Sequence, residues 1–253
     1  MTIVPPLVVV EADAGVLTLT LNRPQSSNAL DPSLVAALDI ALDAASSVDV
    51  GCVLLRAAGK RFCVGGDVTA FGAGSDVAVV ESHVVRTAGV VRRLRELEAP
   101  LVVAAQGAVA GAGLALVLAA DVTVAGRSTR FVPAYNAIGL TPDVGVSWLL
   151  TRAVGERRAL QYLVSGTELT AAEACDWGIV SEVVDDDSVG GHAESICRRI
   201  AASGFAARET KRLLRSASTA TTDDSAGDEA ATFGRALSSD LAQRRIADFL
   251  DRH

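Results

Sequence analysis

Residues 101–120 read LVVAAQGAVAGAGLALVLAA, and this stretch decides the fold class. Its length and hydrophobicity would be enough for a membrane span. However, the run contains Gln106 and three glycines, and it lacks the basic and aromatic flanks that are typical of membrane helices. We therefore interpret it as a buried strand over Leu101–Ala105, a glycine turn around Gly107, and a buried helix over residues 111–120.

Strands and helices alternate on both sides of this stretch. Besides residues 101–105, the predicted strands are Val16–Leu21, Cys52–Arg56, Val122–Ala125 and Ile179–Val184. The predicted helices begin at Asp31-Pro32, at Val80 after a loop over residues 71–79, at residue 111, before Trp148, and at the capping box Thr170–Glu173. From about Gly190 the chain is predicted to be helical, with an interruption near 216–228. The alternation predicts an α/β core over residues 1–190 and a helical C-terminal region over residues 191–253.

Composition excludes several classes of protein. The 253 residues include 23 basic and 30 acidic side chains, for a net charge of −7, and they contain no block of Lys and Arg. Such a chain is not expected to bind nucleic acid or an anionic membrane. The four cysteines form no C-x-x-C pair, so we expect neither a metal site nor a disulfide framework. The first residues carry no basic region, and we expect a cytoplasmic protein without a signal peptide.

Two glycine-rich turns follow predicted buried strands, at Cys63–Asp67 and at Gly107–Gly113. A turn of this kind leaves backbone N–H groups without a strand partner. Two such turns that meet can hold a carbonyl oxygen between two N–H donors and form an oxyanion hole. Neither turn fits a dinucleotide-binding or phosphate-loop pattern. The alternative is that the glycines only permit tight packing of strand on helix.

Several ordered motifs give the chain a resemblance to a known family. They are Leu21–Pro24 with Asn28–Leu30, Phe62–Asp67, Gln106–Gly113 and Ala172–Val180. They resemble the crotonase superfamily, the enoyl-CoA hydratase/isomerase proteins, in register from about residue 7 to about residue 217. The resemblance implies a spiral of ββα turns with a helical C-terminal region that forms trimers or dimers of trimers.

The resemblance also implies an acyl-CoA substrate and a set of site residues. In this family two backbone N–H groups polarise the thioester carbonyl, and these positions fall on Val64 and Ala112. The family's contacts to coenzyme A come from backbone near Ala29 and near the glycine turns, here Gly66, Asp67 and Gly111. The nearby cations Arg23, Lys60 and Arg61 are candidates for the phosphates of coenzyme A. Each cation is otherwise an ordinary surface charge.

The chain departs from the hydratase pattern at both catalytic positions. Hydratases of this family use two glutamates to activate and deliver water, and in register these positions are Ala115 and Tyr135. Neither side chain can act as a carboxylate base. We therefore expect no efficient hydratase activity. Tyr135 is a candidate to line the acyl pocket or to hydrogen-bond the substrate, or it is simply a packed aromatic residue.

One carboxylate remains in a suggestive position, Asp143 in the string Ile138–Gly145. This string is most similar to the branch of the superfamily that isomerises ring epoxides of phenylacetyl-CoA. An acid at this position shuttles a proton in the isomerases and is the nucleophile in 4-chlorobenzoyl-CoA dehalogenase. The alternative is that Asp143 caps the following helix through the N–H groups of Gly145 and Val146.

The sequence therefore predicts an acyl-CoA enzyme that shifts a C=C bond, or a related strained ring, with Asp143 as the proton shuttle. It implies no metal or redox cofactor, since coenzyme A is part of the substrate. A second interpretation is a hydrolytic or dehalogenating enzyme in which Asp143 is the nucleophile and His83 is the base. A third is a binding or scaffolding protein without catalytic activity, which has lost both glutamates. The expected partners are an acyl-CoA thioester and further copies of the chain, in a homotrimer or hexamer.

Overall fold

A mixed β-sheet organises the molecule, which we describe from a computed structural model for residues 5–46, 50–71 and 74–252. Within these residues, six strands form the main sheet in the order β1-β2-β3-β4-β6-β9. β1 and β2 pair as an antiparallel hairpin, and the remaining neighbours are parallel. The strands are β1 (Val8–Asp13), β2 (Val16–Leu21), β3 (Cys52–Ala57), β4 (Leu101–Ala105), β6 (Val122–Gly126) and β9 (Glu182–Val184).

A second, smaller sheet lies beyond the end of β4. Among the described residues it contains β5 (Ala108–Ala110), β7 (Arg130–Val132) and β8 (Leu169–Thr170). β5 is parallel to β7, which is antiparallel to β8. Only Gln106 and Gly107 separate β4 from β5, so the chain turns from one sheet into the other at the predicted glycine turn. The run over residues 101–120 is thus strand, turn, short strand and helix.

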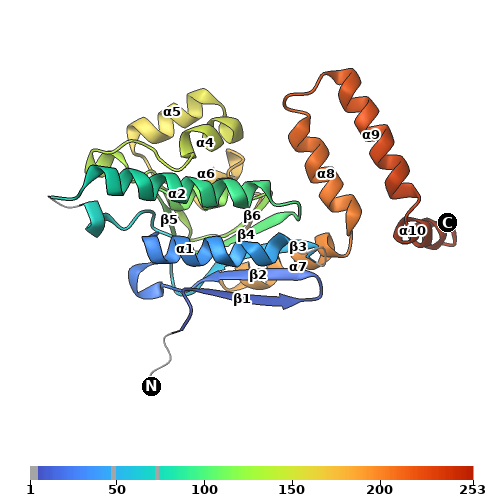
Figure 1. The fold of residues 1–253 in the computed structure, drawn as a ribbon, viewed down its shortest axis with the longest axis horizontal. Helices are drawn as coiled ribbons and strands as arrows, with labels where there is room; N and C mark the ends of the chain where they lie inside the picture. The colour runs from blue at the N-terminus through green and yellow to red at the C-terminus, as the bar shows by residue number, and fades with distance from the viewer. Residues whose placement is uncertain (1–4, 47–49, 72–73, 253) are drawn as a thin grey trace.

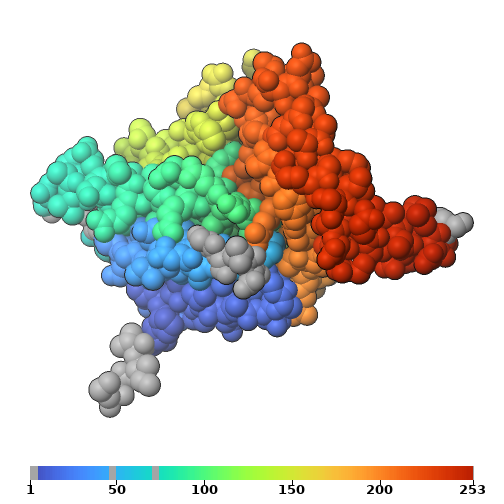
Figure 2. Space-filling model, turned by 45° about the vertical axis from the view of Figure 1, so that its right-hand side comes forward, coloured from blue at the N-terminus to red at the C-terminus, as the bar shows by residue number. Residues whose placement is uncertain are grey.

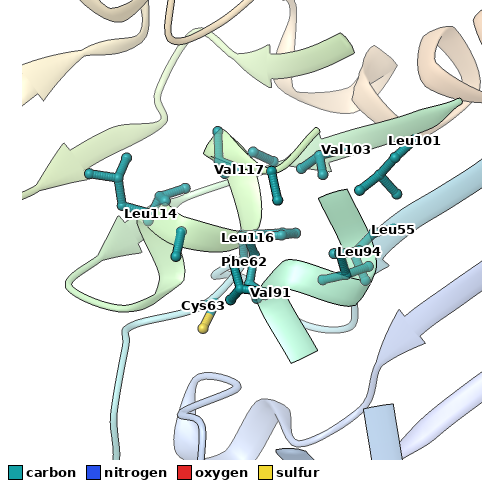
Figure 3. Packing of buried hydrophobic residues seen from close by; sticks show 14 of the residues in the cluster. Leu55, Phe62, Cys63, Val91, Leu94, Leu101, Val103, Leu114, Leu116 and Val117 are labelled. Carbon is teal, nitrogen blue, oxygen red and sulfur yellow. The ribbon is translucent and has the colours of Figure 1, made fainter. Parts of the chain in front are cut away.

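Helices cover both faces of the main sheet because alternate strand residues point to opposite faces. On one face Val53, Leu55, Val103 and Ala105 pack with side chains of α1 (Pro32–Ala41), α2 (Val77–Glu96) and α3 (Gly113–Leu118). On the other face Cys52, Leu54, Val102, Ala104 and Val124 pack against α7 (Val189–Ala201). Figure 3 shows side chains from β3, β4, α2 and α3 gathered around Phe62, which is fully buried.

Shorter helices follow β7, and the last of them, α6, leads from β8 of the small sheet to β9 of the main sheet. α4 (Val146–Val154) and α5 (Glu156–Ser165) pack together beside α3, and α6 (Ala171–Asp176) begins at the predicted capping box of Thr170 and Glu173. The described residues also form short 3-10 helices: η1 (Pro24–Ser26), η2 (Leu42–Ser46), η3 (Val68–Phe71), η4 (Asn136–Ile138) and η5 (Asp186–Ser188).

The last helices form an arm on one side of the body, as Figures 1 and 2 show. The arm consists of α8 (Phe205–Ser216), α9 (Thr222–Leu237) and α10 (Asp240–Leu250). The predicted boundary at residue 190 falls at the start of α7, which packs on the main sheet rather than with the arm. α8 is anchored to the body by Lys211, whose buried ammonium lies 2.8 Å from Asp121 and donates to the Ala99 carbonyl.

Several sequence expectations need correction. The helix predicted from Val80 begins at Val77, because the Asp76 side chain accepts a hydrogen bond from the Ala78 N–H and caps the helix there. Part of the loop predicted over residues 71–79, namely residues 72 and 73, lies outside the described residues. The helix predicted over residues 111–120 is shorter, Gly113–Leu118. The interruption predicted near 216–228 is also shorter, since α9 begins at Thr222.

Two expectations from composition can be compared with the structure. Across the described ranges, no helix combines the length and the hydrophobicity needed to cross a membrane. All four cysteines lie in described segments and are free thiols, three of them buried: Cys52, Cys63 and Cys197.

Candidate active site

The two predicted glycine turns meet in direct backbone contact. The Ala110 N–H donates to the Cys63 carbonyl at 3.0 Å. A Cβ on Gly65 would lie 2.9 Å from the Ala110 oxygen and 3.1 Å from the Ala112 nitrogen, and a Cβ on Gly113 would lie 2.4 Å from the Cys63 oxygen. These separations are too short for any side chain. The glycines are therefore needed for the two turns to approach each other.

The two N–H groups that the family resemblance implies lie on these turns. The Ala112 N–H, just before α3, has no acceptor among the described residues. The Val64 N–H makes a long hydrogen bond of 3.3 Å to the Ser27 carbonyl. Gly111 lies beside the second donor, and its own N–H donates to Val132 in β7. The arrangement can present two donors to one oxygen if the ligand replaces the Ser27 carbonyl at Val64.

Asn28 holds the first turn in place, a role that sequence reasoning did not assign. Its side chain is fully buried; it accepts from the Arg23 N–H and donates to the carbonyls of Ala58 and Arg61. Ser27 and Asn28 both adopt positive φ angles, 53° and 54°, which asparagine tolerates better than most residues. This explains physically why the sequence carries asparagine at this point of the motif.

Residues predicted to contact coenzyme A surround this turn. Gly66 pairs with Leu30 in an isolated parallel bridge, so its backbone lies beside the Ala29 segment. Arg23 donates to the Ala29 carbonyl and forms ion pairs of 3.0 Å with Asp67 and 3.4 Å with Asp31. Its guanidinium is therefore already bonded within the protein.

Two further cations lie closer to solvent. Lys60 is exposed, and Arg61 donates to the Ser27 hydroxyl at 2.9 Å. The Asp67 carboxylate accepts from the Thr69 hydroxyl and N–H, and these bonds, followed by Arg23, hold its pKa below the ordinary value. Asp67 thus stabilises its own turn.

Asp143 and Tyr135 form the polar centre of the site. The Tyr135 hydroxyl donates to Asp143 Oδ1 at 2.9 Å, and both side chains are shielded from solvent, Tyr135 more completely. Burial raises the pKa of Asp143, while the hydrogen bond from Tyr135 opposes this rise. Burial and the adjacent carboxyl raise the pKa of Tyr135 as well, so its hydroxyl keeps its proton. In this pair the Asp143 carboxyl can accept a proton, and the Tyr135 hydroxyl, which keeps its own proton, donates a hydrogen bond that orients the carboxyl.

The structure answers the question of whether Asp143 is a helix cap. α4 is preceded by Gly145, and no side chain caps it. The Asp143 main-chain carbonyl, not the carboxylate, accepts the Val146 N–H at 2.9 Å. Val144 between them has a φ of +42°, a conformation that costs a β-branched residue about 1–3 kcal/mol. The carboxylate remains available for chemistry.

A backbone contact links the second glycine turn to the strand that leads to Tyr135. The Gly111 N–H donates to the carbonyl of Val132 at 3.1 Å, shortly before Tyr135 in the chain. Ala115 is fully buried in α3 and offers no polar group where hydratases carry a glutamate. The thiol of Cys63 is also unsuitable for catalysis, because burial raises its pKa to about 12.

His83 in α2 is part of the same surroundings. Its Nε2 lies 3.0 Å from the Leu30 carbonyl, which can only accept, so Nε2 carries the proton. Its Nδ1 is buried and has no partner among the described residues. His83 lies near enough to Asp143 for its charged form to lower the pKa of that carboxyl. The sequence around His83, which is followed by two valines, does not by itself indicate these surroundings.

Comparison with known proteins then identifies the family. The profile described as "Enoyl-CoA hydratase/isomerase" matches residues 11–253. The chain belongs to the enoyl-CoA hydratase/isomerase family. The resemblance to the crotonase superfamily noted in the sequence is thereby confirmed, and the protein is an acyl-CoA-processing enzyme of this family.

Individual relatives agree with this assignment. Escherichia coli 1,2-epoxyphenylacetyl-CoA isomerase is 36% identical over 218 residues, which cover 83% of this chain and 82% of the relative. Streptococcus mutans trans-2-decenoyl-[acyl-carrier-protein] isomerase is 40% identical over 182 residues, covering 70% and 69%. A Mycobacterium abscessus structure described as a putative enoyl-CoA hydratase/isomerase superposes with a TM-score of 0.92 at 36% identity, covering 97% and 96%. The expected crotonase fold is confirmed.

Proposed function

We propose that the protein isomerises a C=C bond, or a related strained ring, next to an acyl-CoA thioester. One observation carries the proposal. A single half-buried carboxyl, Asp143, is oriented by the Tyr135 hydroxyl, which stands at the position of a missing hydratase glutamate. A hydratase needs groups that activate and deliver water, whereas a double-bond shift needs one base that removes a proton and returns it elsewhere.

In the proposed reaction the Asp143 carboxylate removes a proton from a carbon of the acyl chain. The electron pair moves to the thioester oxygen and gives a dienolate, which the N–H groups of Val64 and Ala112 stabilise. Asp143 then returns the proton to another carbon, and the double bond has moved without any net change in atoms. The raised pKa of Asp143 suits this role, because a shuttle must both accept and release a proton.

Other observations support this choice. The relatives named above include two proteins described as isomerases. We propose that the phosphates of coenzyme A contact Lys60 and Arg61, which are nearer to solvent than Arg23, with Ala29, Gly66, Asp67 and Gly111 contributing backbone contacts. The proposed chemistry needs no metal or redox cofactor.

An isotope experiment tests the proposal. Wild type and Asp143→Asn would be given a 3-enoyl-CoA, a 2-enoyl-CoA and an aromatic acyl-CoA, in heavy water and separately in water labelled with heavy oxygen. We expect a double-bond shift that incorporates deuterium, adds no oxygen, and is lost in Asp143→Asn. Hydration that persists in Asp143→Asn would refute the site, and binding without turnover of any thioester would favour the scaffold interpretation.

Replacing Tyr135 with phenylalanine is expected to move the pH dependence in a defined direction. The Tyr135 hydrogen bond lowers the pKa of Asp143, so its loss should raise that pKa further. Because the base must be ionised, the acid limb of the kcat/KM profile should move to higher pH. The profile would be measured for wild type and Tyr135→Phe, and an unchanged acid limb would show that the pair does not control the base.

A second candidate function is favoured by His83. Its Nδ1 has no hydrogen-bond partner among the described residues and in the neutral ring is a suitable base for water, as hydrolysis of an aspartyl ester intermediate would require. In that case Asp143→Asn should abolish a reaction that inserts one heavy oxygen into the product. His83→Gln should let the covalent aspartyl ester accumulate, which intact-protein mass spectrometry would detect. Isomerisation at an unchanged rate in His83→Gln would leave the first proposal in place.

We further propose a cytoplasmic homotrimer or hexamer assembled through the C-terminal arm. Large apolar side chains of the arm are exposed in the single chain, among them Leu214, Phe233, Phe249 and Leu250. Burying such side chains against other copies would remove apolar area from water.

A further inference from the structure

The turn that carries Asp143 contains a residue that does not suit its backbone. Val144 has a φ of +42° and Gly145 a φ of +90°, the pattern of a type I′ turn closed by the hydrogen bond from Val146 to the Asp143 carbonyl. Glycine, asparagine and aspartate dominate such turns, whereas valine is sterically strained at a positive φ. Among the described residues, Val144 is the only β-branched residue with a positive φ.

The Val144 side chain is held in the core rather than at the surface. Only 5% of the residue is exposed, and it belongs to the hydrophobic core. A glycine here would relieve the backbone but would leave the volume of an isopropyl group unfilled at the residue that directly follows Asp143. Strain that persists at a candidate catalytic turn suggests that the strained residue contributes to function.

We propose that Val144 is a positioning residue for Asp143, whose side chain keeps water away from the carboxyl and fixes it against Tyr135. The inference rests on the proposed role of Asp143 as the proton shuttle. The groups that act electrostatically on this carboxyl are Tyr135, which donates to it, and His83 on α2. Tyr162 on α5 acts on Tyr135 in turn. Val144 contributes no charge, so its effect would come from excluding solvent.

The proposal predicts a shift opposite to that of Tyr135→Phe. Burial is the largest cause of the raised pKa of Asp143, so admitting water should bring that pKa back toward its ordinary value. In Val144→Gly we expect the acid limb of kcat/KM to move to lower pH. We expect kcat to fall about tenfold with KM within about twofold, because a loosened carboxyl is less well aligned with the substrate.

The chain offers a matched control in the β1–β2 hairpin. Ala14 has a φ of +48° and is followed by Gly15 with a φ of +77°, so the same pair of positive angles occurs far from the site on an exposed turn. Ala14→Gly therefore relieves backbone strain without removing a buried side chain. It should leave both the pH profile and kcat at the wild-type values.

The decisive measurement is the titration of the Asp143 carboxyl in the free enzyme. Infrared difference spectra between each protein and its Asp143→Asn counterpart would follow this carboxyl without substrate, so the result does not depend on the proposed function. We expect a lower pKa in Val144→Gly, an intermediate value in Val144→Ala and the wild-type value in Val144→Ile. A wild-type titration in both smaller variants would overturn the proposal. Should Val144→Gly fail to fold, Val144→Ala decides by the same readout.

Discussion

Asp143→Asn is expected to lower kcat/KM by about 10²–10⁴-fold while making the folded protein more stable at neutral pH. The loss of activity is the usual size for removal of a general base. The amide can still accept the hydrogen bond from Tyr135, which lies 2.9 Å from Oδ1, so the geometry of the loop should survive. A loss of kcat/KM together with a gain in stability would show that Asp143 serves catalysis and does not stabilise the fold.

The gain in stability follows from the direction of the pKa shift. Burial raises the pKa of Asp143 in the folded protein above its ordinary value of 3.8, so the folded state holds this proton more tightly than the unfolded state. Stability from this group is therefore present below pH 3.8 and is lost as the pH rises through the folded pKa. Asparagine does not titrate, so Asp143→Asn should be more stable than wild type at pH 7, where the wild-type carboxyl is ionised at an energetic cost.

Urea unfolding of both proteins from pH 8 down to about pH 4 would measure this difference, and the advantage of Asp143→Asn should shrink as the pH falls through the folded pKa of Asp143. Asp67→Asn is the matched control. Its carboxylate has a lowered pKa because Thr69 and Arg23 bond to its charged form, so its stabilisation is present above the unfolded pKa and is lost as pH falls through the folded value. Asp67→Asn should therefore lose stability at neutral pH. Equal losses in both variants would mean that Asp143 serves the fold.

Those parts of the fold that depend on local signals were predictable from sequence. The helix predicted at Asp31-Pro32 begins there, since Asp31 accepts the Leu34 N–H at 2.7 Å and Pro32 occupies the first helical position. The capping box of Thr170 and Glu173 is formed as predicted. Such contacts join residues three positions apart, so a short stretch of sequence contains all the information they need.

Elements that depend on strand pairing rather than on a local hydrophobic pattern were missed. β5 is three residues long and is a strand because it pairs with β7, about twenty residues further along. β1 was also not predicted, since its residues after Val8 are partly or fully exposed and it is defined by its pairing with β2. For such short or exposed strands the hydrophobic pattern is weak, and the three-dimensional pairing decides.

In the candidate site, too, features that depend on local sequence were predictable, whereas contacts between distant residues were not. The glycine turns were recognisable as a pair, because glycine at these spacings is itself the signal. The hydrogen bond between Tyr135 and Asp143 was not predicted, since it depends on how the intervening loop folds back. The bonds from Asn28 to Ala58 and Arg61 reach across about thirty residues. The Nδ1 of His83, which has no partner in the part of the chain that the structure describes, could be recognised only from the structure.

Gly107→Ala is expected to be the most destabilising single substitution that we propose. Gly107 has a φ of +64°, and a Cβ at this position would lie 2.0 Å from the Lys60 carbonyl oxygen. That oxygen belongs to main chain and cannot move aside alone, because the adjoining segment is tied down by the hydrogen bond from the Phe62 N–H to Gln106 and from the Gln106 side chain to Ala57. Adding the cost of the left-handed backbone to that of overpacking gives a loss of about 3 kcal/mol or more.

Gly139→Ala separates these two costs. Gly139 has a similar φ of +70°, but a Cβ there would meet no heavy atom within 4 Å, so this variant should lose only the conformational part, about 1–2 kcal/mol. Urea unfolding would give both values, and equal losses would contradict a steric role for Gly107.

Because the 58–62 segment leads directly into the turn of Val64, the clash in Gly107→Ala should also displace that turn from Ala112. Gly107→Ala should then bind an acyl-CoA product more weakly than wild type, even when it is fully folded at low temperature. Gly139→Ala should bind the product as wild type does.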